Sequence, residues 1–183
     1  MVDHRHKGGR KLPMITDPIF PTSIVTIDKF DGDYRFLSNF FLHDIVYQNL
    51  VYPSVEHLFQ SLKTTMIGAR VTVQTAATAG IAKKIGCKVP LRSDWEAIKQ
   101  SVMMLAIRKK FSDNKLGMML RSTYPSPLVE GNWWHDNCWG DCKCPQCKDK
   151  PGENLLGKIL ISVRKDLILG KPLFVPGFVD PEY

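Results

Sequence analysis

Residues 52–63 read YPSVEHLFQSLK, and they combine a helix start with regularly spaced apolar side chains. Ser54 follows Pro53 and is a residue type that caps helix N-termini. From Val55 onward, apolar residues recur at three- and four-residue intervals as far as Met66. This periodicity predicts an amphipathic helix over residues 55–66, with one side in the core.

Polar side chains mark one edge of this predicted helix. At about 100° per residue, Glu56, Gln60 and Lys63 fall roughly 80–140° from Val55, at the border of the apolar side. His57 lies further round, nearer the solvent side. A carboxylate, an amide and an ammonium group at such a border suit a ligand cleft, and they also suit an ordinary solvated flank.

The rest of the chain predicts more helices and a few strands. Apolar periodicity and capping residues predict further helices at residues 78–86, 94–111, 116–123 and 154–169. Runs of β-branched and aromatic residues predict short strands at residues 24–27, 44–47 and 50–52. Gln48 and Asn49 would form the hairpin turn between the last two strands. We therefore expect an α+β fold, a helix-dominated single domain with a few short strands.

Length and charge set the outline of the protein. The chain has 183 residues and a formal net charge of +7, and its length suits one domain. Residues 1–11 carry a net charge of +3 and residues 142–152 a net charge of +2, which leaves +2 for the rest. A net charge of only +2 on the folded body favours the binding of an anionic small ligand over a broad nucleic-acid-binding surface. We expect a basic tail over 1–22, the domain over 23–170 and a second tail over 171–183.

No stretch of the sequence has the pattern of a membrane segment. The longest strictly apolar run is residues 102–107, whereas a spanning helix needs about 18 apolar residues. The first residues also lack the basic-then-apolar pattern of a secretory signal. We therefore expect a cytoplasmic protein that has no membrane partner.

Several motifs resemble, in the same order, those of the NADAR family. Besides residues 52–63, they are FLSNF at 36–40, LRSDWE at 91–96, RKKF at 108–111, LVE at 128–130, WGD at 139–141 and NLLGKILISVR at 154–164. The resemblance covers residues 28–168 and implies N-glycoside hydrolysis. Known members cleave a ribose–nitrogen bond in phosphoribosylamino intermediates of riboflavin synthesis, and others are associated with removing ADP-ribose from guanine bases.

The resemblance also implies catalytic roles for individual residues. Glu56 matches the family's central glutamate, and a carboxylate beside C1 of the ribose would stabilise the oxocarbenium-like cation that forms as the C–N bond breaks. Lys63 could bind phosphate, protonate the leaving group or attack C1. Asp141 could orient the attacking water or Lys63. This chemistry needs no cofactor.

The remaining residues of the matching motifs are candidate substrate contacts: Ser38, Asn39, His57, Gln60, Arg92, Trp95, Glu130, Trp139, Gly140, Asn154 and Arg164. Asn39 and Gln60 suit ribose hydroxyls, and the two arginines suit phosphate because a guanidinium binds it bidentately. Trp95 offers a flat face for a base.

Structural roles stay open for several of these candidates. Trp95 begins the helix predicted at 94–111, and Trp139 belongs to a tight turn, so either could be a core residue. Asn154 could cap the last helix instead of contacting a ligand. Arg164 could cap a helix end or pair with Glu130.

Four of the five cysteines lie within ten residues: Cys138, Cys142, Cys144 and Cys147. Their thiolates could close a structural zinc site, with His135 as an alternative ligand; a disulfide or redox role and unligated thiols are the other interpretations. NADAR members often have a short glycine-rich link here, so the cysteine-rich loop 138–152 departs from the family pattern. Cys87 stands alone and is expected to be a small buried residue.

Other function classes stay open at this point. A nucleic-acid-binding module would use the positive charge and the cysteine loop, but no motif of a known binding fold is present. A non-catalytic sensor of ADP-ribose or a nucleotide would keep the fold without the reaction, whereas Glu56, Lys63 and Asp141 are all retained here. A metal-dependent hydrolase needs an open coordination position, which four thiolates do not leave. The expected partner is a phosphorylated ribosyl small molecule or an ADP-ribosylated nucleic acid.

Overall fold

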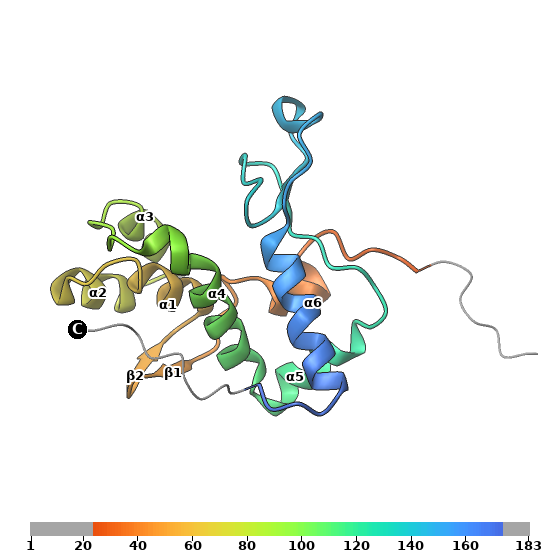
Figure 1. The fold of residues 1–183 in the computed structure, drawn as a ribbon, viewed down its shortest axis with the longest axis horizontal. Coiled ribbons are helices and arrows are strands. Elements are labelled where there is room, and N and C mark those ends of the chain that lie inside the picture. The colour runs from red at the N-terminus through yellow and green to blue at the C-terminus, as the bar shows by residue number, and fades with distance from the viewer. Residues whose placement is uncertain (1–23, 174–183) are drawn as a thin grey trace, which may run out of the picture.

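The structure, a computed structural model, describes residues 24–173 and has a helix-rich α+β fold (Figure 1). Its helices are α1 Val55–Ser61, α2 Ile67–Gln74, α3 Ala79–Gly86, α4 Trp95–Phe111, α5 Asn114–Ser122 and α6 Leu155–Ile168, with short 3-10 helices η1 Gly32–Leu37 and η2 Pro145–Cys147. Its strands are β1 Ile45–Tyr47, β2 Leu50–Tyr52, β3 Gly131–Asn132 and β4 Asp141–Cys142. The predicted fold class is therefore confirmed.

The hydrophobic core forms around α4, which packs against α1 on one side and α6 on the other (Figure 1). Val102, Met103 and Ile107 of α4 are almost completely buried there, as are Leu58 of α1 and Leu160 of α6. Burial of each such side chain contributes about 1.5–3 kcal/mol to folding. The core thus holds the helices that carry most of the family motifs in one rigid unit.

Local capping signals placed the helix starts correctly. The Ser54 side chain accepts a hydrogen bond from the backbone N–H of His57 at 3.4 Å, and Thr78 accepts one from Ile81 at 3.2 Å. These bonds satisfy backbone donors that a helix N-terminus leaves without an intrahelical partner. The starts of α1 and α3 are therefore where the sequence predicted them.

The predicted hairpin is confirmed, but the predicted first strand is not. Gln48 and Asn49 both have positive φ angles, 48° and 61°, the geometry of a two-residue hairpin turn. Residues 24–27 form no regular strand; Ile27 makes a single parallel bridge to Leu128. This bridge ties the beginning of the described chain to the LVE motif.

The helix predicted over residues 55–66 breaks between α1 and α2. The Thr64 hydroxyl accepts a hydrogen bond from the Met66 backbone N–H at 3.3 Å. Bonds of this kind from threonine to its own backbone compete with helical bonds, so they favour a turn. Met66 is consequently exposed, at the start of a helix that the sequence did not predict.

This additional helix changes the environment of His57. Both α2 and α3 pack against α1, on the side that the helical wheel assigned to solvent. His57 is therefore fully buried. Its Nδ1 lies 2.8 Å from Ser54 Oγ and its Nε2 lies 3.1 Å from the carbonyl oxygen of Ala76.

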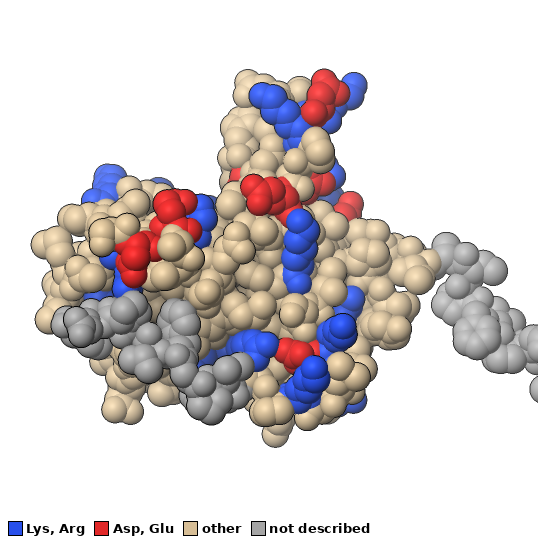
Figure 2. All heavy atoms as spheres, in the orientation of Figure 1, with Lys and Arg blue, Asp and Glu red and all other residues tan. Residues whose placement is uncertain are grey.

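Residues 131–153, which we call the arm, project from the helical body at the N-terminal end of α6 (Figure 1). A two-residue parallel pairing of β3 with β4 lies within it. Figure 2 shows the arm as a protrusion that carries lysine and acidic side chains at its tip. The tail predicted over 1–22, and residues 174–183 of the second tail, lie outside the described residues. Within residues 24–173, no helix is both long and apolar enough to cross a membrane.

Candidate active site

A cleft of about 680 Å³ opens between α1, α3 and the arm. Seven of the residues selected from the sequence line it: Ser38, Asn39, Glu56, Gln60, Lys63, Glu130 and Trp139. They come from the two residues after η1, from α1 and the turn that follows it, from the residue before the arm and from the arm itself. Residues far apart in the sequence thus meet in one concave site, as ligand sites usually require.

Glu56 lies at the buried side of this cleft. Glu56 is only 5% exposed, and its Oε1 accepts a hydrogen bond from Gln60 Nε2 at 2.8 Å. The backbone N–H of Glu56 donates to the carbonyl oxygen of Asn39 at 3.1 Å, which joins the FLSNF motif to α1. Burial raises the pKa of Glu56, and the Gln60 hydrogen bond and the positive charges of Lys83 and Lys63 partly oppose this rise.

Two lysines place positive charge around Glu56. Lys63 Nζ lies 5.6 Å from the ring centre of Phe59 and 5.9 Å from that of Trp95, and its burial lowers its pKa. Lys83 Nζ lies 5.9 Å from the ring centre of Phe40. Both lysines line the cleft, so an anionic group bound there would meet two cations.

Glu130 is a second carboxyl group in the cleft, and burial raises its pKa to about 7. The negative charges of Asp136 and Glu56 contribute to this rise in pKa, and the positive charge of Lys83 opposes it. A carboxyl group with this pKa is protonated in a large share of molecules at neutral pH. Glu130 can therefore exchange a proton under physiological conditions, which an ordinary glutamate does poorly.

Asn154 holds the segment that carries Glu130. Its Oδ1 accepts from the Glu130 backbone N–H at 3.0 Å, and its Nδ2 donates to the Leu128 carbonyl oxygen at 2.9 Å. Two glycines permit this packing. A Cβ on Gly157 would lie 2.2 Å from the Leu128 oxygen, and one on Gly140 would lie 2.3 Å from the Glu130 oxygen. The motifs LVE, WGD and N-x-x-G are thus parts of one contact.

Aromatic side chains form a wall of the cleft. The ring of Phe59 meets that of Trp139 edge-on, with centroids 5.3 Å apart. Trp133 and Trp134, which the sequence analysis did not select, also line the cleft and are 64% and 61% exposed. Tryptophans this exposed are unusual unless they meet a ligand or partner. They offer flat faces on which a heterocycle could stack.

Two buried oxygens beside the cleft have no hydrogen-bond donor within the part of the chain that the structure describes. They are Oδ1 of Asn39 and Oε1 of Gln60. A buried acceptor without a donor is unfavourable by about 1–3 kcal/mol, and such atoms concentrate at functional sites. Asn39 Oδ1 is therefore suited to accept a hydrogen bond from a ligand hydroxyl group, whereas Gln60 Oε1 packs against α3, where a Cβ on Gly86 would lie 2.2 Å from it.

The structure places several other predicted contacts away from the cleft. His57 is buried beneath α2 and α3, and Trp95 is 5% exposed and packs against Phe59 with ring centres 5.1 Å apart. Arg92 binds the Asp94 carboxylate through Nε at 2.6 Å and Nη2 at 3.2 Å. For this reason the Asp94 side chain does not cap α4, although it occupies the cap position.

The WGD motif is divided between the cleft and the arm. Trp139 lines the cleft, whereas Asp141 does not. Asp141 pairs with Lys143 and accepts from the backbone N–H of Gly152 at 2.9 Å. Its contacts are therefore those of a residue that holds the arm together. Gly140 contributes close backbone packing, as described above.

Arg164 is a buried residue of α6 and binds the end of α5. Its Nη1 donates to the carbonyl oxygens of Thr123 and Ser126 at 3.0 and 2.8 Å and contacts the Thr123 hydroxyl at 2.9 Å. Of the roles left open by the sequence, capping a helix end is the one that these contacts support.

Replacing Arg164 with Met is therefore expected to affect stability rather than substrate affinity. Two carbonyl oxygens would lose a charged donor, so we expect the free energy of unfolding to fall by about 2–4 kcal/mol. Urea denaturation measures this change. Arg121→Met, at an exposed position of α5, is the matched control and should be close to the unmodified protein. A higher KM with unchanged stability would instead return Arg164 to the substrate site.

Sequence reasoning missed several residues that shape the cleft. Lys83, Asp136 and the two arm tryptophans line it, and Cys87, expected to be buried, is exposed at its edge. Lys110 of the RKKF motif was also missed; it is completely buried and donates from Nζ to the Ser38 carbonyl oxygen at 2.8 Å. Burial lowers the pKa of Lys110 to about 7. The signal for Lys110 was its place in a family motif.

A separate group of metal-binding side chains lies in the arm. The donor atoms of His135, Cys142, Cys144 and Cys147 all lie within 4.8 Å of one another. Cys138, selected from the sequence as a fourth cysteine ligand, is outside this group, and His135 takes its place. Such a group could hold a metal ion. None of its members lines the cleft.

The family model of the NADAR domain matches residues 27–168. This chain belongs to the NADAR family. It is 30% identical over 156 residues to the N-glycosidase YbiA of Escherichia coli strain K12, a match that covers 84% of this chain and 94% of that protein. The NMR structure of E. coli YbiA has the same fold, with a TM-score of 0.69 and coverage of 87% of this chain and 95% of that one.

Other NADAR relatives have related names. An N-glycosidase of Nostoc punctiforme, Npun_R5314, is 34% identical over 142 residues, which cover 73% of this chain and 86% of that protein. A chloroplastic riboflavin biosynthesis protein of Zea mays, PYRR, is 32% identical over 178 residues, covering 86% of this chain but 28% of the longer plant protein. This NADAR chain is thus similar, along most of its length, to proteins named for N-glycoside cleavage or riboflavin synthesis.

Proposed function

We propose that this NADAR protein is an N-glycosidase that hydrolyses the bond between a phosphorylated ribose and a nitrogen heterocycle. The observation that carries the proposal is the buried Glu56 carboxylate, which lies in a cleft with cationic, aromatic and amide side chains around it. A ribosyl–nitrogen substrate has a matching set of groups: a phosphate, a flat base, hydroxyls and a C1 atom that becomes positively charged in the reaction.

Glu56 stabilises the charge that develops on the ribose. When the C1–N bond breaks, its electron pair leaves with nitrogen and C1 takes on oxocarbenium character. A carboxylate fixed by the Gln60 hydrogen bond favours this state because its position requires no rearrangement during the reaction. Water then adds its oxygen to C1 and releases a proton.

Glu130 supplies the proton that the leaving nitrogen needs. Its pKa of about 7 keeps part of the population protonated at neutral pH, and the buried setting strengthens its hydrogen bond to the leaving group. The proton lost by water restores Glu130 for the next cycle. Asn154 acts through Glu130, as a positioning residue that fixes its backbone.

Lys63 and Lys83 bind the phosphate, and the tryptophans of the arm bind the base. The cations come from the turn after α1 and from α3, on the Glu56 side of the cleft, whereas Trp133 and Trp134 come from the arm. A ligand with its phosphate on the lysines and its base on the tryptophans would place its ribose between these two groups, next to Glu56. This division supports a substrate with a phosphate and a base at opposite ends of the sugar.

Replacing Lys83 with Met is expected to weaken substrate binding more than the chemical step. Loss of one charged contact to phosphate corresponds to about 1.5–3 kcal/mol, so KM should rise on the order of ten- to a hundredfold while kcat changes much less. Lys84→Met is the matched control, because Lys84 is the next residue of α3, is exposed and does not line the cleft. Equal kinetics for the two variants would contradict the phosphate assignment.

The substrate itself is tested with two compounds. The purified protein is incubated separately with a phosphoribosylaminopyrimidine of the riboflavin pathway and with ADP-ribosylated guanine in DNA, and mass spectrometry follows the released base and sugar. Cleavage of either one supports the N-glycosidase proposal and selects the substrate class. Binding of both without cleavage of either would contradict it and favour a non-catalytic sensor.

A further inference from the structure

We propose that the arm binds one structural zinc ion through His135, Cys142, Cys144 and Cys147, and that this ion holds Trp133 and Trp134 in place at the cleft. Three observations carry this inference: the geometry of the four donors, the small amount of apolar packing within the arm, and the position of His135 between residues that line the cleft.

All donor atoms lie within 4.8 Å of one another, and two of the distances are already close to those of a tetrahedral zinc site. With Zn–S bonds of about 2.3 Å and Zn–N bonds of about 2.0–2.1 Å, neighbouring donors in a tetrahedron lie about 3.5–3.8 Å apart. His135 Nδ1 lies 3.2 Å from Cys144 Sγ and 3.5 Å from Cys147 Sγ. Small adjustments would therefore close the site, and no fold change is needed.

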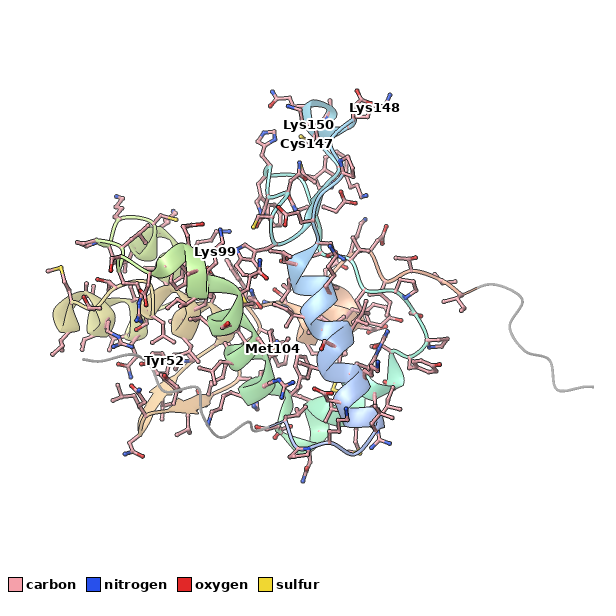
Figure 3. The ribbon with its side chains drawn as sticks, in the orientation of Figure 1. Tyr52, Lys99, Met104, Cys147, Lys148 and Lys150 are labelled. Carbon is pink, nitrogen blue, oxygen red and sulfur yellow. The ribbon has the colours of Figure 1, made fainter. Side chains whose placement is uncertain are left out.

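The chemistry of the donors selects zinc and a structural role. Three thiolates and one imidazole form a soft set that suits zinc, and four protein ligands leave no position for water or substrate. The bound ion and three thiolates would carry one net negative charge. Lys148 and Lys150 lie in the same loop and would offset this charge (Figure 3 labels both beside Cys147), whereas Lys143 already pairs with Asp141.

Apart from hydrogen bonds such as those of Asp136 and Asn137, the arm has little apolar packing of its own to hold it in shape. The three cysteines form a buried cluster of their own, separate from the main hydrophobic core. The regular structure in the arm consists of two-residue strands and the three-residue η2. Figure 1 shows this segment standing away from the body. Segments this small and this poor in apolar contacts commonly depend on a metal or on disulfides for stability.

His135 connects the metal group to the cleft. Its neighbours Trp134 and Asp136 both line the cleft, as does Trp133. His135 itself has a φ of 66°, in the left-handed region that few non-glycine residues adopt. A zinc bond to its imidazole holds the residue in this conformation and fixes the direction in which the adjacent tryptophan enters the cleft.

Metal analysis of the full chain tests the site without reference to catalysis. The protein is purified with Zn²⁺ in the medium, dialysed, and measured by inductively coupled plasma mass spectrometry; we expect about one zinc per chain. His135→Ala and Cys144→Ser should lose it. Cys138→Ser is the matched control, because Cys138 is in the same loop but outside the donor group, and it should retain the ion. Retention by the first two variants, or loss from the third, would overturn the assignment.

Hydrogen exchange of the unmodified protein tests the effect on the cleft, and it remains informative if a variant does not fold. Removal of zinc with a chelator should increase amide exchange over residues 131–147 while α4 and α6 stay protected. Equal exchange with and without zinc would overturn the positioning role. Absence of bound zinc from the unmodified chain would overturn the whole inference. The four side chains would then be held together by thiol–imidazole hydrogen bonds instead of a metal ion. Neither result depends on whether the protein is an N-glycosidase.

Discussion

Glu56→Gln is expected to lower kcat by a factor on the order of a thousand or more, with a much smaller change in KM. The substitution keeps the size of the side chain and its contact with Gln60 but removes the negative charge. That charge acts mainly on the cation formed during bond cleavage, so its loss affects the transition state more than the bound substrate. Steady-state kinetics with whichever of the two test compounds the protein cleaves provides the measurement.

Thermal unfolding separates this catalytic loss from damage to the fold. Burial disfavours the charged form of Glu56, so the neutral Gln side chain should leave the melting temperature unchanged or raise it. Glu96→Gln is the matched control: Glu96 is exposed on α4 and pairs with Lys99, and the variant should retain full activity. Normal turnover by Glu56→Gln would remove Glu56 from the mechanism and with it the central part of the proposed function.

Glu130→Gln is expected to lower kcat/KM by about 10²–10⁴-fold at pH 6 and to change the shape of the pH profile. As a general acid, Glu130 must be protonated before the C–N bond breaks. Its raised pKa of about 7 means that the unmodified enzyme should lose activity as the pH rises through 7. In the variant this descending limb should be absent. Activity that rises with pH through 7 in the unmodified enzyme would instead indicate a general base.

The raised pKa of Glu130 also predicts how the stability of the fold depends on pH. Its folded-state pKa lies above the ordinary value of 4.5, so the folded chain holds more protons than the unfolded chain between pH 4.5 and 7. Stability should therefore decrease as the pH rises through this interval, and Glu130→Gln should remove that contribution. Urea denaturation at pH 5 and pH 8 measures it, with the exposed arm residue Glu153, changed to Gln, as control.

Local sequence patterns were reliable where the decisive interactions are local. Ser54 and Thr78 bond to backbone groups three residues away, so their helix starts could be predicted without the rest of the fold. Glu56 and Gln60 line the cleft from one edge of α1, as helical geometry predicts, and their interval along the chain determines the direction of their side chains. Lys63 also lines the cleft, but from the turn after α1.

Predictions for the arginines, for His57 and for Trp95 depended on contacts that the sequence does not reveal. A motif arginine suits phosphate, but the charge of Arg92 is taken up by Asp94 and that of Arg164 by the carbonyl oxygens at the end of α5. Burial of His57 required α2, which forms only because the first helix breaks at Thr64. None of these outcomes is encoded in the spacing of apolar residues.

The sequence by itself determined the helix-rich class, the family resemblance and the central carboxylate, because capping, periodicity and ordered motifs act over short distances along the chain. The tertiary structure decided which charged groups face the cleft, which are satisfied elsewhere, and that His135 rather than Cys138 joins the other cysteines. Those assignments depend on packing between segments up to a hundred residues apart, since only the folded chain brings their atoms within bonding distance.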